Sequence, residues 1–190
     1  MSECACTPGQ TVGPFLHLGL PYSGDSALVG DGHPHAVRLH GTVYDGAGDG
    51  VPDALVELWQ PDGTGRIPRR AGSLRRGHQD DAGFTGWGRC ATDAAGRYAF
   101  TTVAPGSAGA GRPAFFALTV FARGLLDRLF TRAYLPGTDP GADPLLAGLD
   151  AERRATLLCD AESDCRAYRF DIHLQGPRET VFLAYRDGAR

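Results

Sequence analysis

Short segments of apolar and polar residues alternate with turn-forming residues along most of this 190-residue chain. Residues 37–44 alternate apolar and polar side chains, the pattern of a strand with one face on a core. A cluster rich in Gly and Asp follows at 45–50, and further strands are predicted over 54–59 and 97–102, the second ended by Pro105-Gly106. This spacing predicts a fold made mainly of β-strands.

The second half of the chain continues the pattern. Residues 113–123 form a long apolar run, which is typical of a strand buried on both faces. We expect 125–134 to be its antiparallel neighbour, with a turn at 122–124. We also expect 168–175 and 180–185 to form a final hairpin.

One helix is predicted late in the chain. Asp150 is suited to cap its N-terminus, and Leu157 and Leu158 would lie on its inner face. Strands and helix together predict an all-β protein, a two-sheet β-sandwich with long loops and one or two short helices. The chain length suits one domain. We expect that domain to span 36–190 and to follow an N-terminal arm and loop over 1–35.

Composition and charge limit the classes of partner. The 27 glycines and 13 prolines suit a domain with many turns, and all 19 basic residues are arginine, as GC-rich codon usage would produce. A net charge of -3 gives no reason to expect nucleic acid or an anionic membrane as a partner. The first residues lack the features of a signal peptide, and no segment is apolar enough to span a bilayer. We therefore expect a cytoplasmic protein whose five cysteines are reduced thiols.

Histidine and cysteine spacing does not predict a metal centre. His33-Pro34-His35 has His-x-His spacing but lies in a loop rich in Gly and Asp. Cys4-Ala5-Cys6 lacks the second Cys-x-x-Cys-like half that zinc sites usually show. Trp59 ends an alternating segment, so we expect it to pack in the core rather than to stack on a ligand.

A set of motifs runs in a fixed order along nearly the whole chain, at 7–15, 41–46, 51–60, 88–93, 96–100, 112–117, 121–124, 168–176 and 179–183. The first reads Thr-Pro-Gly-Gln-Thr-Val-Gly-Pro-Phe, and the segment at 112–117 begins Arg-Pro-Ala. In this order the motifs resemble those of the intradiol ring-cleavage dioxygenase family, and 88–100 resembles that family's central hairpin. The resemblance implies a β-sandwich and cleavage of a catechol ring by O2 at a ferric iron.

The resemblance also locates the four positions at which family members hold iron through two tyrosines and two histidines. In this chain they are occupied by Ile67, Ala108, Phe115 and Ala117. None of these side chains offers a lone pair to a cation, so this chain cannot bind iron in the family's way. The family's alpha-type subunits tolerate such losses because a partner beta subunit carries the metal. The resemblance thus implies no metal here, Fe3+ in a homologous beta subunit, and a hetero-oligomer of the two.

Five residues are implied by the same resemblance to line the partner's substrate cavity: Thr11, Gly13, Pro14, Phe15 and Arg123. The Gly-Pro pair allows a close and rigid backbone approach, and a guanidinium suits the carboxylate of an aromatic acid. Residues 1–35 would contact the partner chain.

The implied reaction is cleavage of 3,4-dihydroxybenzoate (protocatechuate) by O2 to 3-carboxy-cis,cis-muconate, with no catalytic residue in this chain. Two alternatives stay open. One is a catalytically inert β-sandwich binding or scaffold module derived from the family. The other is a homo-oligomer whose catalysis uses unrelated residues.

Overall fold

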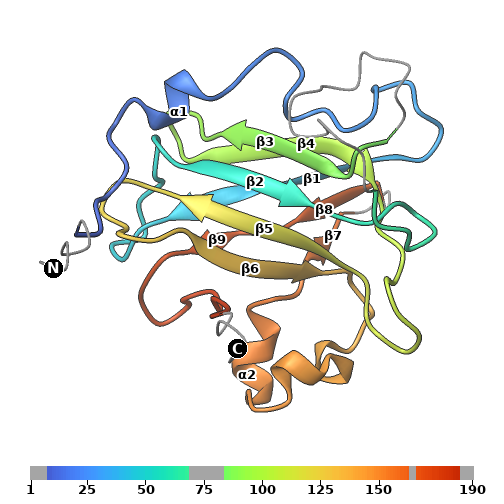
Figure 1. The fold of residues 1–190 in the computed structure, drawn as a ribbon. Helices are drawn as coiled ribbons and strands as arrows, with labels where there is room; N and C mark the ends of the chain where they lie inside the picture. The colour runs from blue at the N-terminus through green and yellow to red at the C-terminus, as the bar shows by residue number, and fades with distance from the viewer. Residues whose placement is uncertain (1–7, 69–83, 163–165, 185–190) are drawn as a thin grey trace, which may run out of the picture.

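The computed structural model describes residues 8–68, 84–162 and 166–184, and its strands form two sheets (Figure 1). One sheet has the strand order β4-β1-β8-β7, with β9 pairing further along β1. Its strands are β1 (Ala36–Tyr44), β4 (Arg97–Val103), β7 (Asp160–Ala161), β8 (Ala167–Arg169) and β9 (Ile172–His173). The other sheet is antiparallel with the order β3-β2-β5-β6. Its strands are β2 (Leu55–Trp59), β3 (Trp87–Ala91), β5 (Phe115–Phe121) and β6 (Leu129–Tyr134). The predicted two-sheet β-sandwich is confirmed.

The core lies between the two sheets because each strand turns alternate side chains inward. Its fully buried members include Leu39, Val43, Phe100, Val56, Leu58, Phe116, Leu118 and Val120. On β5 the inward face is completely buried, whereas Phe115, Ala117 and Phe121 on the other face are only partly buried. The prediction that this strand is buried on both faces was therefore only half correct.

The helices are short and lie at the edges of the sandwich (Figure 1). They are α1 (Leu16–Gly19), α2 (Ala151–Ala155) and the 3-10 turns η2 (Pro140–Ala142) and η3 (Pro144–Leu146). The predicted N-cap is confirmed, since the Asp150 carboxylate accepts a hydrogen bond from the Arg153 N–H at 2.8 Å. Leu157 is buried, but Leu158 is 36% exposed because the helix ends before it. None of the helices in the described ranges has the length and apolar character needed to cross a membrane.

Two predicted hairpins were wrong. Segments 88–93 and 96–100 supply β3 to one sheet and β4 to the other, so their connection crosses between the sheets. The final hairpin is replaced by β8 and β9, which both pair in parallel with β1. The segment from 180 onwards turns instead to the other sheet, where Leu183 bridges Phe130 on β6. Tyr185, its predicted end, lies outside the described residues.

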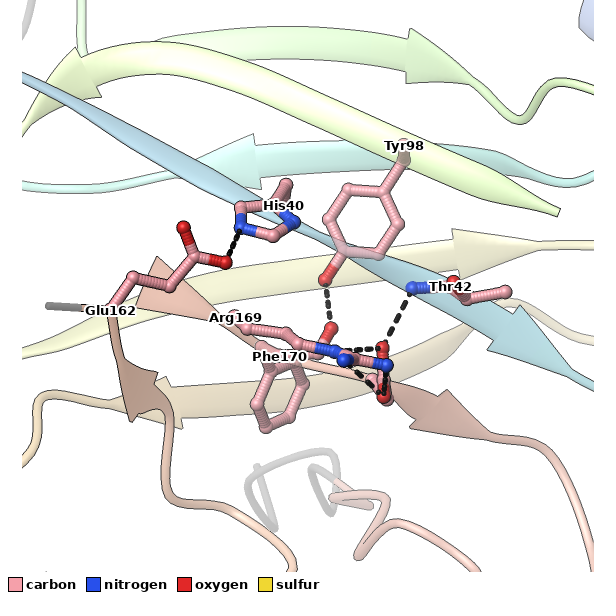
Figure 2. Close-up of polar contacts among 7 residues, drawn as sticks. His40, Thr42, Tyr98, Glu162, Arg169 and Phe170 are labelled. Carbon is pink, nitrogen blue, oxygen red and sulfur yellow. Dashed lines mark hydrogen bonds and ion pairs between the residues drawn. The ribbon is translucent and has the colours of Figure 1, made fainter. Parts of the chain in front are cut away.

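The junction of β1 with β8 and β9 depends on one glycine. A Cβ on Gly41 would stand 1.9 Å from the carbonyl oxygen of Phe170, so only glycine permits this approach. The same carbonyl accepts a hydrogen bond from the buried Tyr98 hydroxyl at 2.6 Å (Figure 2). Where the parallel ladder breaks, the Thr42 N–H donates to the Asp171 carboxylate at 3.0 Å. A side chain therefore replaces the missing backbone acceptor.

Candidate functional site

The N-terminal segment and the turn after β5 lie against each other at one end of the sandwich (Figure 1). The Gly124 N–H donates a hydrogen bond to the Thr11 hydroxyl oxygen at 2.6 Å. A Cβ on Gly9 would stand 4.0 Å from the Leu126 Cβ. Gly124 has a φ of +96°, which suits glycine at this turn. The structure thus brings Thr11 next to the turn that contains Arg123.

The Arg123 side chain is held by an ion pair at its Nε atom and is otherwise largely exposed. Its Nε lies 3.1 Å from a carboxylate oxygen of Asp53, whose side chain is 11% exposed, whereas the Arg123 side chain is 61% exposed. No hydrogen bond from the two terminal guanidinium nitrogens of Arg123 is found in the described part of the chain. A guanidinium oriented in this way keeps both terminal nitrogens available for a carboxylate.

The other predicted cavity-lining residues are exposed at the same end. Gly13 and Pro14 are exposed, and no atom lies within 4 Å of a Cβ built on Gly13. The Phe15 side chain is 74% exposed, and Leu18 on α1 and Leu126 on the adjoining turn are each 66% exposed. Large apolar side chains in water are a feature of surfaces that bind another protein.

The four positions that the resemblance assigns to the family's iron ligands lie at the opposite end of the sandwich. The loop after β2 packs on the loop after β4, since the Gly106 N–H donates to the Asp62 carbonyl at 2.9 Å. These two loops carry Ile67 and Ala108, respectively. Phe115 and Ala117 start β5, where Ala117 is the register partner of Trp59 at the end of β2. The four positions therefore share one end of the molecule, but their side chains contain no nitrogen, oxygen or sulfur atom that could coordinate a metal.

A buried ion pair lies beside two of these positions, and sequence reasoning missed it. Arg132 on β6 is directly opposite Ala117, and its guanidinium carbon lies 4.2 Å from the centre of the Phe115 ring. Arg132 forms an ion pair with Asp143, which also accepts a hydrogen bond from the Tyr134 hydroxyl at 2.7 Å. No spacing in the sequence connects Arg132 with Asp143, because the loop between them folds back to make the contact.

Electrostatics favours the charged form of this pair. The Arg132 and Asp143 side chains are 17% and 5% exposed. Burial opposes ionisation of Asp143, but its hydrogen bonds and the Arg132 charge together hold the pKa of this carboxyl below its usual range. Burial raises the pKa of the Tyr134 hydroxyl, which therefore remains a donor to Asp143 at neutral pH.

The two ends of β5 are too far apart to form one site. Arg123 lies six positions after Ala117, which corresponds to about 20 Å along an extended strand. Thr11 and Arg123 therefore cannot line the region around Phe115 and Ala117 in the same chain.

Two further expectations can be compared with the structure. Trp59 was predicted to pack in the core, but it is 42% exposed, because it lies on the outer face of its sheet with its ring centre 6.1 Å from that of Trp87. His33 and His35 are exposed at the rim of an open cavity of about 740 Å³. No group of three or more His, Cys, Asp or Glu side chains in the described ranges is arranged to hold a metal ion. Cys4 and Cys6 lie outside those ranges.

A family model described as Dioxygenase matches residues 13–176. The chain is also 39% identical over 200 residues to the protocatechuate 3,4-dioxygenase alpha chain of Burkholderia cepacia, covering 96% of this chain and 99% of the relative. This chain belongs to the intradiol ring-cleaving dioxygenase family. The strongest of the sequence-based interpretations, the family resemblance, is thereby confirmed.

This dioxygenase homologue is also similar to the other type of subunit. It is 34% identical over 164 residues to the protocatechuate 3,4-dioxygenase beta chain of Burkholderia cepacia, covering 78% of this chain and 68% of the relative. Among solved structures, the dioxygenase domain of a dioxygenase and carbohydrate-binding protein fusion from Streptomyces sp. SirexAA-E superposes with a TM-score of 0.59. That match has 24% identity and covers 90% of this chain and 99% of the other, so it supports the fold alone.

Proposed function

We propose that this chain is the non-iron-binding alpha subunit of a protocatechuate 3,4-dioxygenase, and that it completes the active site of a homologous, iron-bearing beta subunit. One observation carries the proposal. The chain matches an alpha chain over nearly its whole length, yet its four ligand positions hold Ile67, Ala108, Phe115 and Ala117. Because these side chains cannot coordinate a cation, the residues of this chain do not fit the family's ferric iron.

In the proposed complex the beta subunit holds Fe3+ and cleaves 3,4-dihydroxybenzoate with O2 to 3-carboxy-cis,cis-muconate. The contribution of this chain is to shape and charge the cavity. The segment from Thr11 to Phe15 would wall it, since its backbone is exposed and open at Gly13. The terminal nitrogens of Arg123 would hold the substrate carboxylate. Their position about 20 Å from this chain's own lost ligand positions supports a role in a partner's site.

The same geometry supports a partner surface on the N-terminal arm. Residues 1–35 would form the arm and loop that contact the beta subunit, with 36–190 as the single sandwich domain. Phe15, Leu18 and Leu126 supply exposed apolar surface beside Arg123. We expect no binding to nucleic acid or membranes. A cytoplasmic location stays a prediction from the sequence, and fractionation of the native host tests it.

Isolation of this chain from its native host, followed by a visible absorption spectrum, tests the proposal. We expect a second chain of similar size and a broad tyrosinate-to-iron band that bleaches or shifts when 3,4-dihydroxybenzoate is added. A colourless chain without a partner would overturn the proposal and leave the inert binding or scaffold module in its place.

A further inference from the structure

Arg132 lies beside the two β5 positions that the resemblance assigns to metal ligands, Phe115 and Ala117. Residues directly opposite each other in an antiparallel pair point to the same face, with Cβ atoms about 5 Å apart. Arg132 therefore shares the outer face of the sheet with Ala117, and with Phe115 two residues earlier on the same strand. Its guanidinium packs on the Phe115 ring at 4.2 Å. A cation ligated from positions 115 and 117 would meet this guanidinium at close range.

The guanidinium is fixed in this place by an ion pair and by the hydrogen bonds that orient its counter-ion. Asp143 supplies the counter-charge and is almost completely buried. Tyr134, fully buried, donates to the same carboxylate oxygen that pairs with Arg132. Leu145 N–H donates to the second oxygen of Asp143 at 3.0 Å, which holds the carboxylate at the start of η3. Arg132, its counter-ion Asp143 and the Phe115 ring on which it packs thus form one cluster.

We propose that Arg132, anchored by Asp143, replaces the metal as the cation at this end of the sandwich and excludes metal ions from it. The proposal rests on the proposed function, because the family's ligand positions define where the metal would lie. It adds a second reason for the absence of iron binding. Loss of the four ligands removes the donors, and the guanidinium places a positive charge beside the two positions on β5.

Restoring two ligands tests this directly. In the full-length chain, Phe115→His/Ala117→His places two imidazoles on one face of β5, a pair able to chelate a divalent ion. The probe is Zn2+ alone, measured by isothermal titration calorimetry in the absence of any partner chain. We expect addition of Arg132→Gln to tighten Zn2+ binding at least about ten-fold, because a cation no longer faces the site. Equal affinity with and without Arg132, or no binding in either case, would overturn the proposal.

Two controls separate repulsion by Arg132 from other effects. Arg128→Gln removes an arginine that stacks on Phe130 next to the same strand, and we expect it to leave Zn2+ affinity unchanged. An equal gain there would mean a general charge effect and would refute the assignment. Arg132→Gln/Asp143→Asn removes both charges of the pair. In the histidine-pair chain, this double change should still tighten Zn2+ binding. If only Arg132→Gln tightened it, the gain would come from the Asp143 carboxylate, which is left without its partner and could bind Zn2+ itself.

Thermal unfolding of the native chain keeps the proposal testable if the histidine pair does not fold. A buried carboxylate without its cation is costly, so Arg132→Gln should lower Tm, and Arg132→Gln/Asp143→Asn should recover part of the loss. An Arg132→Gln chain as stable as the native one would show that no buried cation is needed. The Zn2+ and stability readouts need no beta subunit, so their failure is distinguishable from failure to find a partner.

Discussion

Replacing Arg123 by alanine should affect substrate binding far more than the stability of the chain. The Arg123–Asp53 pair is exposed on the arginine side, and such pairs contribute about 1 kcal/mol or less. For a chain of this size, that corresponds to a Tm decrease of about 2–4 °C. A charge-assisted hydrogen bond to a substrate carboxylate contributes about 1.5–3 kcal/mol, or roughly a 10- to 100-fold change in an equilibrium constant.

The assay is oxygen consumption by the complex with the beta subunit. We expect Arg123→Ala to raise KM for 3,4-dihydroxybenzoate roughly 10- to 100-fold. Turnover of catechol, which has the same ring without the carboxylate, should change little. Iron content should also be unchanged, because the proposed metal site belongs to the partner.

Asp53→Asn is the matched control, since it releases Arg123 from its ion pair but keeps the guanidinium. It should raise KM much less than Arg123→Ala does. Unchanged kinetics in Arg123→Ala would remove Arg123 from the site. Equal losses with the two substrates would mean that Arg123 acts through assembly or cavity shape rather than by contact with the carboxylate.

Three other predictions follow from the described contacts. Gly41→Ala should destabilise the chain by about 3 kcal/mol in a urea titration, because its Cβ would overlap the Phe170 carbonyl. The control Gly148→Ala has open space around it and should cost about 1 kcal/mol or less. Because the pKa of Asp143 is lower in the folded chain than in the unfolded chain, where it is about 4, its ionisation stabilises the fold above that pH. This contribution is lost as pH falls through the folded pKa. The difference in free energy of unfolding between the native chain and Asp143→Asn should therefore narrow below about pH 4. A constant difference from pH 7 to 3 would contradict this. Thr11→Val removes the hydrogen bond between the arm and the turn after β5. It should weaken association with the partner by about five-fold in surface plasmon resonance, while Tm stays nearly constant. Unchanged association would mean that this hydrogen bond serves local structure alone.

Local patterns were sufficient to predict β1 and β4 in one sheet and β2 in the other. The predicted segments 37–44, 54–59 and 97–102 match β1, β2 and β4 to within one residue at each end. Alternation marks such strands because one face packs on the core, and Gly- or Pro-containing turns limit them. The strand predicted over 125–134 begins only at Leu129, since the turn after β5 is longer than its sequence indicates.

Non-local pairing accounts for what sequence reasoning could not predict. Segment 168–173 has the alternation of a strand, but no pattern in it indicates that its partner is β1 in parallel rather than the segment that follows. Trp59 has the sequence context of a core residue, yet the register of β2 against β5 puts it on the outer face beside Ala117. Arg132 and Asp143 meet only because η2 and η3 return the chain to β6.

The geometry of β5 explains how one chain could lose a metal site and still serve an active site. The strand starts at Phe115 and Ala117, among the lost ligand positions, and ends two residues before Arg123. About 20 Å of buried strand separates the two ends, so substitutions that remove ligands at the start leave the turn at the end undisturbed. The core face of the strand, which both ends share, is intact. A dioxygenase chain could therefore exchange its ligands for an internal ion pair at one end, while the other end kept the arm and arginine to which we assign a role in a partner's cavity.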